Sequence, residues 1–162
     1  MTPDITVKGG SAKQRSLLFE AAHYYLERLL PDNYQEITLL IRLKKNHGEH
    51  KGVKGSCVWE DDRDDPSEFE IILDSSMCTK ALLRYLAHEC VHCKQYFTQE
   101  MCDTKHVEIV RWKGVKIDMR KVDYYDHPWE IDAYGREEGL YQHFVKKFKY
   151  TNKQWNTDRD YK

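Results

Sequence analysis

The sequence His88-Glu89-Cys90-Val91-His92 lies inside a stretch, Met77 to Gln99, that is rich in helix formers and contains neither Gly nor Pro. Residues four apart lie one above the other on a helix, so both imidazoles can bind one metal ion while Glu89 lies beside them. A catalytic zinc site takes three protein ligands and leaves the fourth position to water. The H-E-x-x-H pattern therefore predicts that His88 and His92 bind zinc, that Glu89 is the general base, and that a third ligand comes from elsewhere.

The third ligand is predicted on a last helix that begins at Pro128, a residue well suited to a first helical turn. The positions that follow helical spacing here are Glu130, Ala133, Tyr134, Glu137, Leu140, Tyr141, Phe144 and Phe148. Glu130 shares the apolar face, where an ionised carboxylate needs a partner or a metal ion. This favours Glu130, 130 − 92 = 38 residues after the motif, as the third ligand. Alternatively, Glu130 only complements the helix N-terminus, or His127, Asp126 or Glu137 is the ligand.

Composition indicates one soluble globular domain. The chain has 162 residues, of which 33% are charged and 40% hydrophobic, with a formal net charge of −1. This length suits one core, and this charge balance gives no electrostatic case for a nucleic-acid partner or a membrane surface. No leader peptide and no run of about 18 apolar residues is found, so we expect a cytoplasmic protein, in the host cytoplasm if the source is viral.

Cysteine usage favours reduced thiols. The five cysteines are Cys57, Cys78, Cys90, Cys93 and Cys102. An odd number without a secretion signal argues against a disulfide framework, and we expect none to be bridged. Cys90 and Cys93 form a C-x-x-C pair that also occurs in structural Cys/His metal sites, but no second pair accompanies it. We therefore interpret them as buried thiols at a helix interface.

Turn signals and hydrophobic periodicity predict an α+β fold in one domain, 1–162, with about three strands in a small twisted sheet. The expected elements are a flexible arm over 1–10, a helix from Ser11 to Pro31, strands over Ile37–Leu43, Gly52–Glu60 and Phe69–Asp74, the motif helix with Ser76 or Thr79 as its cap, a hairpin over Val107–Asp118 turning at Lys113-Gly114, the last helix, and a tail over 150–162. The acidic run Glu60–Asp65 is interpreted as a solvated loop, with cation binding as the alternative.

A family resemblance rests on His88-Glu89-x-x-His92, on Gln95 three residues further on, and on Pro128-Trp129-Glu130-Ile131-Asp132-Ala133. With these residues the chain resembles the gluzincin metallopeptidases over roughly Gly52 to Tyr141, most closely small, minimal-domain and phage-type members with a Pro-Trp-Glu third-ligand helix. The resemblance implies a compact zincin-like domain, zinc on His88, His92 and Glu130, and Glu89 as general base.

The chain departs from this family at one position that matters for the site. Tyr134 stands where the family has an acid four residues after the third ligand. The carboxylate that orients a zinc histidine must then come from elsewhere, and Glu137 and Asp132 are the candidates. The tail with Lys146, Lys147, Lys149 and Lys153 lies outside the resemblance.

The predicted activity is zinc-dependent hydrolysis of a peptide or protein substrate, with an oxyanion stabilised by Tyr124, Tyr125, Tyr134 or His127, which sequence does not rank. The rival hypothesis is a catalytically silent, zinc-stabilised module that presents its Lys-rich tail to an acidic or nucleic-acid partner. Whether the metal keeps an open coordination position distinguishes the two.

The resemblance also implies where the substrate binds. The strand over Gly52–Glu60 would form the sheet edge above the zinc, where an extended peptide can add itself as another strand. Ser56, Cys57 and Val58 are the predicted contact segment, with an ordinary edge strand as the alternative. If the N–H of Val58 faces the substrate, Val58→Pro should impair cleavage and Cys57→Pro should serve as its control.

Overall fold

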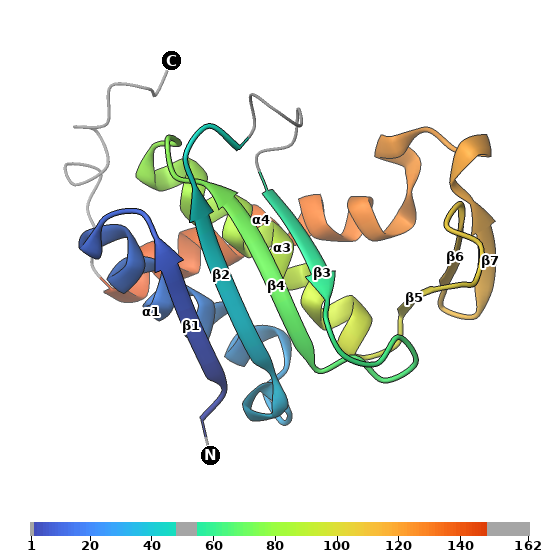
Figure 1. Cartoon of the computed structure of the whole chain (residues 1–162), viewed down its shortest axis with the longest axis horizontal. Helices are drawn as coiled ribbons and strands as arrows, with labels where there is room; N and C mark the ends of the chain where they lie inside the picture. The colour runs from blue at the N-terminus through green and yellow to red at the C-terminus, as the bar shows by residue number, and fades with distance from the viewer. Residues whose placement is uncertain (1, 48–54, 149–162) are drawn as a thin grey trace.

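The computed structural model describes residues 2–47 and 55–148. Its elements are β1 (Asp4–Gly9), α1 (Ala12–Leu29), η1 (Tyr34–Glu36), β2 (Thr38–Lys44), β3 (Gly55–Trp59), β4 (Glu68–Asp74), α3 (Thr79–Phe97), β5 (Met101–Asp103), β6 (Ile109–Trp112), β7 (Val115–Asp118), η2 (Met119–Lys121), η3 (Tyr124–Asp126) and α4 (Pro128–Phe148). The strands form a four-stranded sheet in the order β1-β2-β4-β3 and a three-stranded sheet in the order β5-β6-β7. The fold class is α+β, as the sequence predicts (Figure 1).

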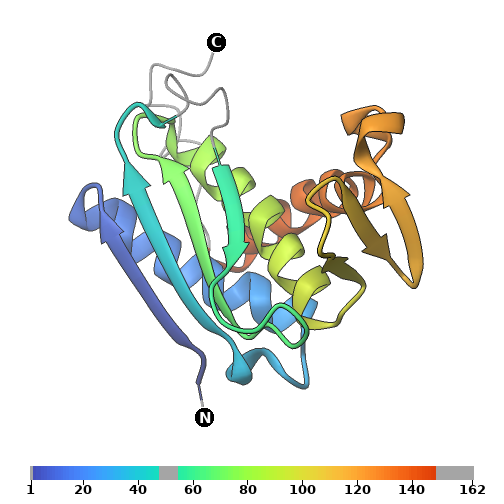
Figure 2. The ribbon, with the colours of Figure 1, turned by 45° about the vertical axis from the view of Figure 1, so that its right-hand side comes forward.

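The helices cover one face of the larger sheet (Figures 1 and 2). Alternate residues of β2 and β4 point toward them and are almost fully buried, namely Leu39, Ile41, Phe69, Ile71 and Leu73. The opposite face carries the Arg42–Glu70 ion pair at 2.8 Å, which remains partly exposed. This one-sided burial follows from the period of two along each strand, and it places the motif helix α3 against the sheet.

The prediction of a flexible arm over residues 1–10 is wrong for the part that forms the first strand. Residues 4–9 form β1, which pairs in parallel with β2. Ile5 is buried, and alternates with exposed Asp4 and Thr6 as in a strand with one covered face. Gly9 and Gly10 adopt φ of 83° and 60° at the turn into α1, where a Cβ on Gly9 would collide with the Leu43 carbonyl. The larger sheet therefore has four strands rather than about three.

The N-terminal helix α1 begins as predicted, because Ser11 and Gln14 form a capping box. The start of α3 differs from the prediction. Its N-cap position is Cys78, whose side chain makes no capping hydrogen bond, and Ser76 instead donates its backbone N–H to the Asp74 carboxylate at 2.9 Å. Neither Ser76 nor Thr79 occupies the N-cap. The apolar face of α3 packs into the core, so the motif is held firmly without a side-chain cap.

The predicted hairpin is confirmed as β6 and β7, which turn at Lys113 and Gly114 with φ of 47° and 87°. The short strand β5 was not predicted, since three residues carry too little pattern. Met101 and Val110 pack with Trp129 from α4 in a small second core, which fixes the smaller sheet beside the start of α4. The predicted tail, and residues 52–54 of the predicted edge strand, lie outside the described residues. None of the described helices is long and apolar enough to cross a bilayer.

Candidate metal centre

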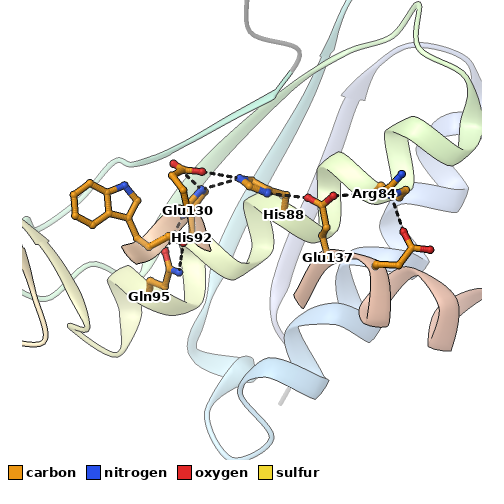
Figure 3. A network of polar contacts seen from close by, with 8 residues as sticks. Arg84, His88, His92, Gln95, Glu130 and Glu137 are labelled. Atoms are coloured by element: carbon orange, nitrogen blue, oxygen red, sulfur yellow. Dashed lines mark hydrogen bonds and ion pairs between the residues drawn. The ribbon is translucent and has the colours of Figure 1, made fainter. Parts of the chain in front are cut away.

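The structure brings together the three residues predicted as metal ligands. His88 and His92 lie one turn apart on α3, and Glu130 comes from the first turn of α4. The three side chains are buried and their ligand atoms lie within 4.8 Å of one another. Figure 3 shows them pointing toward a common centre. Among the described residues, this is the one group of His, Cys, Asp and Glu side chains that could hold a metal ion.

The spacing of the donor atoms suits a tetrahedral ion. His88 Nε2 lies 3.1 Å from His92 Nε2 and 3.2 Å from Glu130 Oε2. His92 Nε2 lies 3.5 Å from Glu130 Oε1. Bonds of about 2.0–2.1 Å that meet at the tetrahedral angle place ligand atoms about 3.3 Å apart. The two separations to Glu130 involve different oxygens of its carboxylate, and all three separations lie close to the tetrahedral value, so the donor groups are spaced suitably for one ion.

The outer nitrogens of both histidines are held by hydrogen bonds that leave Nε2 for the centre. His88 Nδ1 lies 2.9 Å from Glu137 Oε2, and His92 Nδ1 lies 2.8 Å from Gln95 Oε1. An ionised carboxylate and an amide oxygen only accept, so each Nδ1 donates. For neutral imidazoles, both Nε2 lone pairs then face each other and the Glu130 carboxylate. Such an arrangement of lone pairs is repulsive unless a cation or protons lie between them.

Gln95 owes its orientation to α4. Its Nε2 donates to the Trp129 carbonyl at 2.9 Å and to Asp132 Oδ2 at 3.0 Å, which leaves Oε1 for His92. The two acids named from sequence therefore support different histidines, Glu137 directly and Asp132 through Gln95. Tyr134, which replaces the expected acid, packs its ring against His88 with centroids 4.6 Å apart. Both histidines thus have an outer partner despite the departure at Tyr134.

The electrostatics of the donor group show the same need for positive charge. Burial lowers the pKa of His88, but its hydrogen bonds with Glu130 and Glu137 outweigh burial and raise that pKa to about 9. Burial acts in the opposite direction on Glu130, yet its contacts with His88 and His92 hold its pKa below the ordinary value. Protons therefore gather where the ligand atoms converge, and a metal cation would take their place.

Glu89 lies beside the donors and next to β3. It is 5% exposed, and burial raises its pKa despite the opposing influence of both motif histidines. A Cβ built on Gly55 would come within 3.1 Å of Glu89 Oε1. The absence of a side chain at Gly55 leaves room for the carboxylate at the edge of the sheet.

A cleft of about 600 Å³ opens over the site. One wall is β3, and the floor carries His88, Glu89, His92 and Glu130. The other wall is formed by residues 104–107, which follow β5, and by the first two residues of β6. Asp103 also lines the cleft and links β5 to β3 and α3, because Trp59 Nε1 donates to its Oδ2 at 2.8 Å and the Tyr96 hydroxyl donates to its Oδ1 at 3.2 Å. This network was missed from sequence, where nothing links residues 44 positions apart.

The other residues considered from sequence lie in different places relative to the cleft. Tyr124 lines the cleft with the donors, and burial and contact with Glu130 raise the pKa of its hydroxyl. His127 is buried and stacks on Trp129 with centroids 4.7 Å apart, outside the donor group. Cys90 and Cys93 are buried in the main core, as interpreted, and belong to no metal-binding group among the described residues. All five cysteines are free thiols.

The edge strand has the predicted position, but its N–H groups point in the opposite directions to those predicted. β3 is the edge strand of the larger sheet and pairs with β4 in a regular antiparallel register. The Glu60 N–H donates to the Glu68 carbonyl at 2.8 Å. In an antiparallel pair, every second residue points both its backbone N–H and its C=O toward the partner strand. Counting back from Glu60, Val58 and Ser56 therefore bond to β4, whereas the N–H and C=O of Cys57 point to the open edge. The choice of Val58 as the substrate-facing donor, with Cys57 as its control, is therefore wrong.

No known protein family, no curated protein and no solved structure matches this chain.

Removing the Glu137 carboxylate is expected to weaken metal binding about 10- to 100-fold, because it orients His88 through Nδ1. Titration of Glu137→Ala with zinc in competition with a chelator measures this. Glu138→Ala is the matched control, since Glu138 also pairs with Arg84, at 3.0 Å, and lies one residue further along α4. Equal zinc affinity in both variants would show that Glu137 does not support the ligand.

Proposed function

We propose that this protein is a zinc-dependent metallopeptidase with a zincin-like catalytic domain. The observation that carries the proposal is that three converging donor atoms and the buried Glu89 carboxylate lie in one cleft beside an open strand edge. Two imidazoles and one carboxylate are a donor set typical of catalytic zinc. The group has three members among the described residues, which leaves a coordination position for water or substrate.

Zinc is the ion that this donor set fits best, with His88 Nε2, His92 Nε2 and Glu130 as its ligands. When bound, it would polarise the scissile carbonyl and lower the pKa of a water molecule. The proton transfers are carried out by a protein side chain. Glu89 accepts the proton of the attacking water and delivers it to the leaving amine, as a general base and then a general acid. Its place beside the donors and on the cleft floor suits both transfers.

Tyr124 is the best candidate for stabilising the oxyanion. Of the four residues considered from sequence, Tyr124 is the one that lines the cleft. Its hydroxyl contacts Glu130, which places a hydrogen-bond donor beside the metal ligands. Tyr134 packs against His88 outside the cleft, and His127 is stacked on Trp129. A donor on the cleft side is what a developing negative charge on the carbonyl oxygen requires.

The substrate would bind as an added strand along β3. Ser56 and Cys57 both line the cleft, whereas Val58 is 45% exposed and does not. The outward N–H and C=O of Cys57 are placed to pair with a peptide backbone. Main-chain pairing of this kind holds an extended peptide with little dependence on its side chains.

Cys57→Pro is therefore expected to lower kcat/KM about 3- to 10-fold, the effect of one backbone hydrogen bond, while zinc stays bound. Cys57→Ala is the control, since it removes the same thiol and keeps the N–H. Zinc content and peptide cleavage are measured on both. Equal activity in the two variants would exclude the β3 edge as the substrate site. Val58→Pro should instead destabilise the fold, because it removes a bond between β3 and β4.

The proposal as a whole is tested with zinc-loaded protein and a mixture of unstructured peptides, with the products identified by mass spectrometry. We expect internal peptide bonds to be cleaved, cleavage to stop when a chelator removes the metal, and cleavage to return when zinc is restored. A protein that binds zinc stoichiometrically and cleaves no peptide would instead support the catalytically silent module.

A further inference from the structure

A second groove, of about 470 Å³, lies on the outer face of the smaller sheet. Its lining residues are Thr104, Lys105, His106, Ile109, Lys116, Asp118 and Lys121. The strand register explains which residues share this face, because directly paired residues point to the same side of a sheet. Ile109 is paired with Asp118, and Arg111 is paired with Lys116. The intervening residues, such as Val110, point to the other face and pack near Trp129. The groove is thus separated from the small apolar core by the thickness of the sheet.

The groove is strongly cationic. Lys105, Lys116 and Lys121 come from three different segments and are all exposed. The acid in the groove, Asp118, is already paired with Arg120 at 2.9 Å, and this contact holds the pKa of Asp118 low, at about 2. Lys116 has a second cation, Arg111, directly opposite, and Asp64 is an acid that interacts with Arg111. Asp118 also interacts electrostatically with Lys121. The groove still has more lysines than acids, so it offers excess positive charge to a ligand, although the whole chain has a net charge of −1.

The groove continues from the catalytic cleft. Thr104, Lys105, His106 and Ile109 line both. The Thr104 hydroxyl donates to the Ile109 carbonyl at 2.8 Å, which folds the shared segment into a compact turn. An extended chain that lies across the donors can therefore pass over this turn and reach the three lysines. The positive charge and the position of the groove therefore favour a negatively charged segment at this end of the cleft.

We propose that the groove is a subsite for an acidic segment of the peptide substrate, located on one side of the bond to be cleaved. The inference rests on the proposed peptidase function. A carboxylate-rich chain matches three separate ammonium groups, which act as point charges without a fixed geometry. A peptide fits better than a nucleic acid, because none of the described residues that line the groove is a Phe, Tyr or Trp that could stack on bases. The subsite makes the enzyme selective for substrates that carry Asp, Glu or phosphorylated residues beside the scissile bond.

The test is direct binding, measured by fluorescence anisotropy on the zinc-loaded Glu89→Gln protein, so that turnover does not interfere. The probes are a labelled peptide with four consecutive Glu residues, the same peptide with Gln, and one with phosphoserine. We expect the Glu peptide to bind about tenfold tighter than the Gln peptide at low salt, with the difference shrinking as salt is added. The phosphoserine peptide shows whether carboxylate or phosphoryl groups are preferred.

The variant Lys105→Gln/Lys116→Gln/Lys121→Gln is expected to abolish the preference for the Glu peptide. The control Lys8→Gln/Lys13→Gln/Lys44→Gln removes the same charge from β1, α1 and β2 and should keep it. A preference unchanged in the groove variant would overturn the proposal. So would tighter binding of a short single-stranded DNA that depends on the same lysines. If charge-dependent binding is found and the parent protein cleaves none of the three peptides, the proposed function fails while the anion site stands.

Discussion

Glu89→Gln is expected to lower kcat for peptide cleavage by about 10²- to 10⁴-fold while zinc content stays at about one ion per chain. The amide keeps the size of the side chain and cannot accept the proton of the attacking water. Glu89 is buried with its pKa raised, so a neutral amide relieves a desolvation cost, and the melting temperature should not fall. Single-turnover cleavage, metal analysis and thermal unfolding on the same preparation measure the three quantities.

The matched control is Glu36→Gln on η1, the same chemical change in a residue remote from the cleft, which should leave all three unchanged. Retained turnover in Glu89→Gln would remove Glu89 from the mechanism. Loss of stability without loss of zinc would indicate that the carboxylate serves the fold instead.

His88→Ala, His92→Ala and Glu130→Ala are each expected to reduce bound zinc from about one ion per chain to a small fraction after dialysis. Each variant keeps two of the three protein ligands, and no other described residue belongs to the group that could replace the lost one. Elemental analysis of the dialysed proteins measures the loss. Cleavage should be lost in parallel, because the same ion supplies both metal content and activity.

His127→Ala is the control for this series. His127 is buried at the start of α4, three residues before Glu130, but lies outside the donor group. It should therefore keep its zinc. Full zinc occupancy in Glu130→Ala together with loss in His127→Ala would show that the third ligand is assigned wrongly.

Sequence predicted those parts of the fold whose pattern is local. The helix of the motif, the last helix from Pro128 and the turn at Lys113-Gly114 follow from periodicity and turn residues. Glu130 stood out because an acid on an apolar face has few alternatives to a metal or a positive partner. Glu137 was named as a candidate partner of a histidine, but only the packing of α3 against α4 determines that it reaches His88 rather than His92.

Three further failures, beyond the cap of α3 and the short strand β5, share one physical cause, which is pairing between segments distant in sequence. β1 has few buried residues and exists as a strand because β2, 34 positions later, pairs with it. The outward N–H of Cys57 depends on which residues of β3 bond to β4, and a shift of one residue would exchange Cys57 and Val58. The cationic groove likewise joins Lys105, Lys116 and Lys121 only after β5, β6 and β7 form their sheet.

We propose that His88, His92 and Glu130 hold a zinc ion with an open coordination position toward the cleft. Diffraction data collected above and below the zinc absorption edge, on crystals of the zinc-loaded protein, test it most directly. We expect one anomalous peak about 2.0–2.2 Å from His88 Nε2, His92 Nε2 and a Glu130 oxygen, with only water in the position that faces the cleft. A peak at any other site, or a fourth protein ligand that closes this position, would contradict it.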